Sequence, residues 1–177
     1  RQRPMPAQEE IIERPAKAKW WLITWSTYAS WLPGDPRGFQ TWRGEEYVPP
    51  PKRYAEPGEA TYDSSEYTEL YDLAQRISND AVRLTRSQQQ TALDAVVAEI
   101  SKSDLIPAIL AQGATHAHLL AVFGKLKIRK MVGRLKAAAT RELRSGEVEM
   151  NPERTWSRGC HMKSKETRRE YMNAYNY

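Results

Sequence analysis

The sequence predicts an α+β domain, in which helices pack on one face of an antiparallel sheet. Three patterns support this prediction. The aromatic and β-branched run at 20–28 has the composition of a buried strand, two apolar runs separated by Gln112 and Gly113 form a hairpin pattern, and 125–144 has apolar residues at helical spacing. Hydrophobic residues occupy 40% of the 177 positions, which is enough for one domain with its own core.

The first half of the chain is expected to hold one strand and a long loop. The fold is expected to begin at Lys19, after a flexible lead-in at 1–18 that is rich in Pro, Gln and charge. A surface loop is predicted at 30–62 because PGDPRG, PPPK and EPG are turn sequences that interrupt regular elements. Weak helical character follows at 64–80, and 81–85 is predicted as a short strand or an extended connector.

The second half alternates helices and strands. The predicted elements are a helix at 88–101 capped by Ser87, a hairpin with strands at 106–111 and 114–123, a helix at 125–144, a strand at 155–162 and a last helix from Lys165 capped by Ser164. An antiparallel sheet with helices on one side accommodates this order. The specific expectation is therefore a ferredoxin-like domain spanning 19–177.

Charge favours an anionic partner. The net charge is +5 and the pI is near 9.3. Acids dominate 45–72, whereas 125–144 holds eight Lys or Arg against the single acid Glu142, so a positive stripe is expected on one helix. No apolar run approaches the roughly 20 residues of a membrane helix, so no membrane partner is expected. Cys160 is the only cysteine, which excludes an intrachain disulfide and favours a cytoplasmic location.

The sequence Thr-His-Ala-His at 115–118 is the densest chemical signal. Side chains two apart on a strand share a face, so His116 and His118 are predicted to lie close enough to bind one metal ion. The chain has only three histidines, so two of them are less expected to fall at this spacing by chance than in a histidine-rich protein. Histidines on a strand are nevertheless more often solvent-facing or structural, and the pair alone does not identify a metal site.

Tyrosines of the last predicted helix are candidate nucleophiles. They are Tyr171, Tyr175 and Tyr177, and they follow a cluster of Lys and Arg. A phenol has an ordinary pKa near 10, so it attacks phosphorus only when a base or a cation assists it. A neighbouring metal ion supplies that assistance and also polarises the phosphate. The alternative is that these rings pack the helix against the sheet.

Basic and aromatic side chains are candidate DNA contacts. The predicted cationic contacts are Lys125, Lys127, Arg129, Lys130, Arg134, Lys136, Arg37 and Arg158. Trp20, Trp21, Trp25, Trp31 and Trp42 are candidate stacking platforms for unpaired bases, and at least one of Trp21 and Trp25 is expected in the core instead. An ordinary solvated helix face is the competing interpretation of the basic stripe.

Four stretches resemble the REP-associated tyrosine transposases, a group within the HUH single-tyrosine transposase superfamily. They are 24–38 (TWSTYASWLPGDPRG), 82–89 (VRLTRSQQ), 115–120 (THAHLL) and the final helix that ends in Tyr-Asn-Tyr. Together they are distributed over most of residues 19–177. The first stretch is the most discriminating, and the third is similar to the metal motif of the superfamily.

The resemblance implies an HUH endonuclease fold and a DNA transposase or nicking endonuclease of the bacterial cytoplasm, associated with the nucleoid. Its DNA partner would be single-stranded and next to a hairpin. A helix-borne tyrosine would attack the scissile phosphate and give a 5′-phosphotyrosine with a free 3′-hydroxyl. His116 and His118 would bind Mg²⁺ or Mn²⁺, although imidazoles ordinarily suit Zn, Fe, Ni or Cu better than Mg.

Two features of the resemblance leave the site open. Tyr177 aligns best as the nucleophile, but the aliphatic residue and the polar third ligand that follow it in the family have no counterpart in this sequence. Tyr171 and Tyr175 have the four-residue spacing that places side chains on one helix face. The alternatives are a domesticated protein that binds structured DNA without cutting it, and a metal-dependent hydrolase that uses water as the nucleophile.

Overall fold

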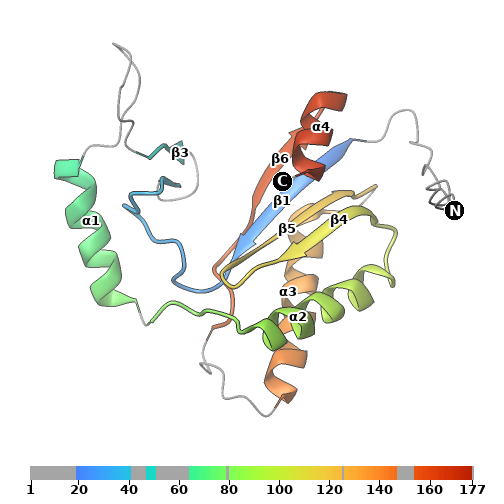
Figure 1. Cartoon of the computed structure of the whole chain (residues 1–177), viewed down its shortest axis with the longest axis horizontal. Coiled ribbons are helices and arrows are strands. Elements are labelled where there is room, and N and C mark those ends of the chain that lie inside the picture. Colours follow the sequence, from blue (N-terminus) through green and yellow to red (C-terminus); the bar gives the residue numbers. More distant parts are fainter. Residues whose placement is uncertain are drawn as a thin grey trace, which may run out of the picture.

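The computed structural model describes residues 19–40, 47–50, 64–78, 80–124, 126–146 and 154–176. Within these ranges the chain forms a four-stranded antiparallel sheet, a two-stranded sheet and four helices (Figure 1). The predicted α+β class is confirmed. The predicted lead-in at 1–18 lies outside the described residues, as do Trp42, Lys125 and Tyr177.

The main sheet has the strand order β4-β5-β1-β6. Its strands are β1 (Trp20–Ser26), β4 (Ile106–Gln112), β5 (His116–Val122) and β6 (His161–Lys165). The predicted hairpin at 106–123 is confirmed as β4 and β5, which pair antiparallel. The first strand in the described part of the chain is central, because β1 pairs with β5 on one side and with β6 on the other.

The larger core lies between the sheet and two helices, α2 (Arg86–Ile100) and α3 (Ile128–Ser145). Ile23 and Trp25 of β1 are packed there with Val96 of α2 and Leu135 of α3, all at most 2% exposed. The predicted helix at 125–144 is thus confirmed in substance, and its apolar stripe faces the sheet as helical periodicity requires.

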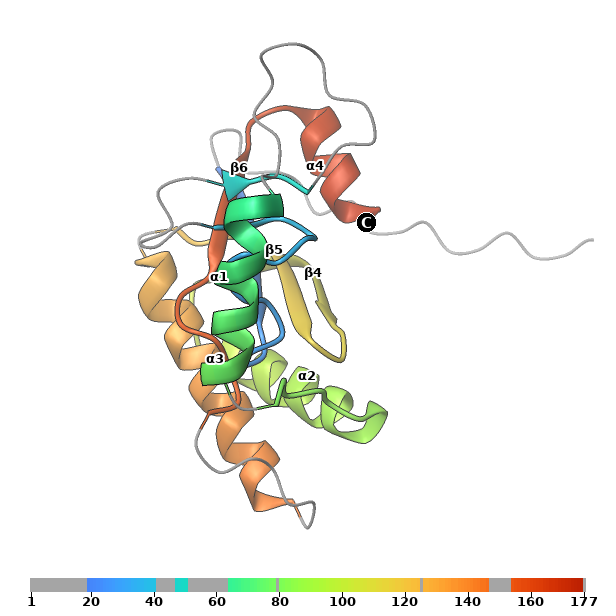
Figure 2. The same cartoon turned by 90° about the vertical axis from the view of Figure 1, so that its left-hand side faces the viewer.

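A smaller core lies on the opposite face, under α4 (Arg168–Tyr175). Trp20, Leu120 and Val122 are packed there with Ala174 of α4. Figure 2 shows α3 and α4 on opposite sides of the sheet. The expectation that helices pack on one face is therefore wrong. Alternation along β1 and β5 explains the arrangement, because both faces of these central strands carry apolar residues and both must be covered.

The predicted loop at 30–62 contains regular structure. Two short strands, β2 (Phe39–Gln40) and β3 (Tyr47–Val48), form the small sheet, and α1 (Ser64–Ile77) follows. Gly34 has φ +78° and approaches α1 so closely that a Cβ would lie 2.5 Å from the Tyr67 carbonyl oxygen. The PGD sequence therefore allows the loop backbone to contact a helix, which turn composition alone does not reveal.

The N-cap of α2 is Thr85, and the predicted cap at Ser87 is wrong. The Thr85 hydroxyl accepts from the Gln88 backbone N–H, and the Gln88 side chain accepts from the Thr85 N–H at 2.9 Å. Thr85 and Ser87 both precede a glutamine by three residues, so both fit the capping-box pattern. Thr85, the first of the two, is the residue whose side chain caps the first turn of α2.

A strand precedes the last helix as predicted, but it is β6 at 161–165, so the predicted bounds of 155–162 are wrong, as is the predicted cap at Ser164. Within the described residues 154–160 there is only an isolated bridge between Thr27 and Trp156, and Gly159 with φ +69° interrupts the extended backbone. Ser164 lies inside β6. The cap of α4 is Thr167, whose hydroxyl accepts from the Glu170 N–H.

Thr27 joins the end of β1 to three other segments. It is fully buried, its hydroxyl donates to the Val82 carbonyl at 2.6 Å, and its N–H donates to the Thr115 carbonyl at 2.8 Å. Its own carbonyl accepts from the Ser157 hydroxyl at 2.8 Å. The connector before α2, the turn before His116 and the segment before β6 are thereby held together.

Replacing Thr27 by Val should destabilise the protein. The change keeps the shape of the side chain and removes a buried donor, so we expect the free energy of unfolding to fall by about 1–3 kcal/mol in urea denaturation. Thr91→Val is the matched control, because the Thr91 hydroxyl makes an exposed bond to the Ser87 carbonyl. The control should change stability by less than about 0.5 kcal/mol. Equal effects of the two substitutions would contradict the role given to Thr27.

Candidate metal centre

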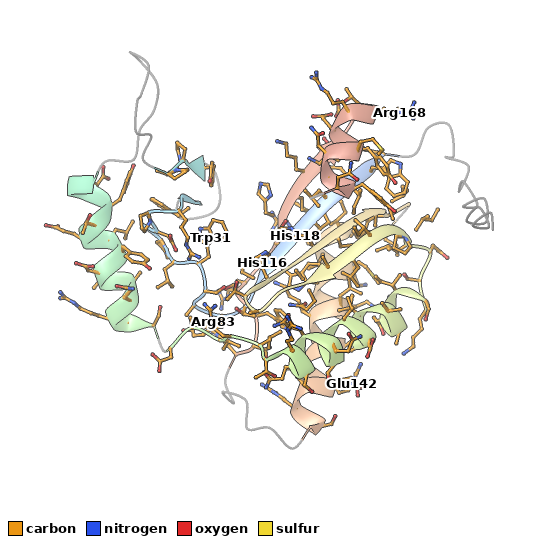
Figure 3. All side chains as sticks on the ribbon, viewed as in Figure 1. Trp31, Arg83, His116, His118, Glu142 and Arg168 are labelled. Carbon is orange, nitrogen blue, oxygen red and sulfur yellow. The ribbon has the colours of Figure 1, made fainter. Side chains whose placement is uncertain are left out.

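His116 and His118 project from the same face of β5, on the side of the sheet that α4 covers. Their ring centroids lie 4.8 Å apart with an interplanar angle of 73°. The next residue on this face of β5 is Leu120, which packs with Ala174 of α4. Figure 3 shows the two histidines between the loop that carries Trp31 and the helix that carries Arg168 in this view. Two ring nitrogens can therefore approach one ion.

A threonine hydroxyl contacts Nδ1 of each histidine. The Thr24 Oγ1 lies 2.8 Å from Nδ1 of His118, and the Thr115 Oγ1 lies 3.2 Å from Nδ1 of His116. When Nδ1–H donates to the hydroxyl, the ring lone pair is on Nε2, the remaining nitrogen. Such outer contacts fix the orientation and the tautomer of metal-binding histidines. Thr24 was not predicted as a partner of His118, because its proximity depends on the pairing of β1 with β5.

Burial lowers the pKa of His118 below its ordinary value, and the nearby His116 lowers it further. Both effects disfavour the charged imidazolium. A neutral imidazole is the form that binds metal ions, so the surroundings favour the binding-competent state. The lowered pKa of His118 and the short distance between the two rings therefore both favour metal binding.

Further ligands would have to come from outside the pair. Across the residues that the structure describes, no group of three or more His, Cys, Asp or Glu side chains is arranged to hold a metal ion. The two histidines fit a metal only as part of its coordination shell, which oxygens of water or of a bound phosphate would complete. His161 lies on the same face but one strand beyond Thr24, with which it is in register.

The two described tyrosines of α4 differ in their surroundings. The ring of Tyr171 is half-buried and packs edge-on against Trp20, with centroids 5.0 Å apart. The ring of Tyr175 is 44% exposed and stacks on Tyr171 at 6.1 Å. The packing alternative thus describes Tyr171 well, and Tyr175 is the more accessible phenol. Tyr177, the best-aligned candidate, lies outside the described residues.

The basic helix α3 lies on the face of the sheet opposite to His116 and His118. Lys127, Arg129 and Lys130 are exposed on that side. Arg134 pairs with Glu99 of α2 at 2.6 Å. The structure therefore separates the predicted cationic stripe from the histidine pair.

Lys136, also predicted as a DNA contact, has structural partners. Its ammonium donates to the carbonyls of Ser157 and Gly159, and burial lowers its pKa. These bonds hold the segment before β6 against α3. Arg158, in the same segment, is exposed, and the preceding Ser157 donates its N–H to the carbonyl of Ser26, which is in register with His116.

In the first loop, Arg37 is bound by Asp35, whose side chain is 1% exposed. The guanidinium also donates to the Ser30 carbonyl at 2.8 Å and lies 5.3 Å from the ring centroid of Trp31. The ring of Trp31 is 42% exposed, whereas Trp25 and Trp20 are core residues at 2% and 8%. The expectation for Trp25 is confirmed, and Trp31 is the described tryptophan most accessible for stacking.

Comparisons with known proteins identify no relative. No protein-family model matches the chain, and neither a curated protein nor a solved structure matches it. Among the helices in the described ranges, none has the length and apolar character needed to cross a membrane. We therefore infer function from the side chains of this chain and from the resemblance that its sequence motifs show.

Stability should fall with acidification through His118. Its folded-state pKa is lower than the ordinary 6.5, so the unfolded chain binds more protons just below that value. In chelator, the free energy of unfolding should therefore decrease as the pH falls from about 7.5 through 6.5 toward the lowered pKa. His118→Gln should weaken this dependence, and His161→Gln, at an exposed position of β6, should retain it. Urea denaturation at several pH values measures both, and identical pH dependences for His118→Gln and the wild type would refute the assignment.

Proposed function

We propose that this protein is a metal-dependent endonuclease and strand transferase that acts on single-stranded DNA, related to the REP-associated tyrosine transposases. The observation that carries the proposal is the pair of imidazoles, 4.8 Å apart, on the face of the sheet that also holds the tyrosine-bearing helix α4. Single-stranded DNA next to a hairpin is the proposed partner. Its phosphates match the positive net charge of the chain.

His116 and His118 would hold Mg²⁺ or Mn²⁺ through Nε2, with Thr24 and Thr115 orienting the rings. When bound, the ion polarises the scissile phosphate and favours the deprotonated form of a phenol. The histidine side chains themselves would position the phosphate beside α4. In support, the two histidines share a face of β5 with Leu120, which belongs to the same core cluster as Ala174 of α4.

A tyrosine of α4 would be the nucleophile. Its Oη forms a bond to phosphorus while the bond to the 3′-oxygen breaks, so that the phenolic proton is lost and the leaving oxygen becomes a 3′-hydroxyl. The product is a 5′-phosphotyrosine, which retains the energy of the phosphodiester for rejoining. Tyr175 is favoured over Tyr171 because its ring is exposed, and Tyr177 remains a candidate by alignment.

The proposal is tested by trapping a covalent protein–DNA adduct. The full chain is incubated with Mn²⁺ and a labelled single strand that carries a hairpin, and the products are separated under denaturing conditions. We expect an adduct that chelator abolishes, and its loss in His116→Ala and His118→Ala. Of Tyr171→Phe, Tyr175→Phe and Tyr177→Phe, one should lose the adduct and the other two should serve as its controls.

Two results would contradict the proposal. An adduct that forms equally in His118→Ala would remove the histidines from the reaction, and DNA cleavage that persists when all three tyrosines are Phe would indicate that water is the nucleophile. Binding of hairpin DNA without any adduct would instead support a non-cleaving DNA-binding protein. That second function is favoured by the absence of a third nearby metal ligand among the described residues.

A further inference from the structure

Three cationic or hydrogen-bonding side chains of β6 lie on the same face as the histidine pair. His161, Lys163 and Lys165 are in register with Thr24, Leu22 and Trp20 of β1, so all three project to the α4 side. His161 and Lys163 are exposed. Thr24 is in register with both His118 and His161. His161, where this row of side chains begins, is therefore two strand spacings from His118, or about 10 Å.

Acids near this row are concentrated at its α4 end. Glu166 pairs with Lys19 at 3.2 Å. Glu170 accepts the backbone N–H groups of Glu166 and Thr167, which lower its pKa, and Lys165 lowers it further. Among the described side chains, no carboxylate forms an ion pair with Lys163. The positive charge is therefore least compensated at Lys163, next to His161 and toward the histidine pair.

We propose that His161 and Lys163, extended by Lys165, form a phosphate-binding strip that leads the DNA strand to His116 and His118. A lysine ammonium binds a phosphate oxygen as a point charge, and an imidazole N–H donates to one in either protonation state. The inference rests on the proposed function, because it names the surface that the substrate of that site would occupy. It also assigns DNA to the α4 side of the sheet, opposite to the stripe on α3.

Exposed lysines on an edge strand also discourage pairing with other sheets. That role predicts no change in DNA affinity when a lysine is removed, so it is distinguishable from phosphate binding. Lys102 provides a matched control. It is an exposed lysine beyond the end of α2, paired with Glu99 at 3.8 Å, and α2 covers the other face of the sheet.

The test measures binding of the full-length protein to a fluorescent hairpin-bearing single strand by anisotropy, in chelator, over a range of salt concentrations. Lys163→Ala should weaken binding several-fold and make the plot of log K against log salt less steep by about 0.7, the value for one phosphate contact on a single strand. His161→Ala should also weaken binding. Lys102→Ala should match the wild type.

Mn²⁺ binding is measured separately by calorimetry, where Lys163→Ala and His161→Ala should match the wild type. The strip would be overturned if both β6 variants bound DNA with the affinity and salt dependence of the wild type. It would also be overturned if the salt dependence became flatter in Lys130→Ala of α3 and stayed unchanged in Lys163→Ala. Either result would leave the adduct test of the histidine pair unaffected. Conversely, an adduct that survives His118→Ala would refute the proposed function while the salt dependence still reported on the strip.

Discussion

The register in which β1 pairs with β5 and β6 is the constraint on which the rest of the structure depends. It places Thr24 opposite His118 on one side and opposite His161 on the other. A slip of one residue would exchange the faces of an entire strand, so that apolar side chains of the main core would meet α4 and the histidines would meet α2 and α3. The buried residues on both faces make such a slip costly. The packing of the cores thereby fixes the geometry of the candidate metal centre.

The two faces of the sheet have different contents. The face toward α2 and α3 is filled by large apolar side chains and forms most of the core. The other face is apolar only where α4 covers it, near Trp20 and Val122, and becomes polar toward the ends of the strands at Ser26 and His116. This change along one face places the histidine pair on a rigid sheet, where both side chains are partly buried and Nε2 of His118 is buried. Such rigid support is what a positioned pair of ligands requires.

Local patterns predicted the features that depend on neighbouring residues. Period-two alternation was sufficient to place His116 and His118 on one face, and helical periodicity identified α3. Pairing between distant segments was not predictable in the same way, so the positions of Thr24 and His161 on the face of the histidine pair were not predicted. The side of the sheet on which each helix lies is likewise a long-range property, and the basic stripe of α3 was predicted beside a site from which the structure separates it. Two overlapping capping signals, at Thr85 and Ser87, explain the misplaced start of α2.

The central position of β1 also affects how the domain can fold. Both neighbours of this strand follow it at long separation in the sequence, and Trp20 pairs with Val122 on one side and with Lys165 on the other. Neither edge of β1 can therefore be covered by a local hairpin. Contacts between such distant residues slow folding and prolong the exposure of unpaired strand edges.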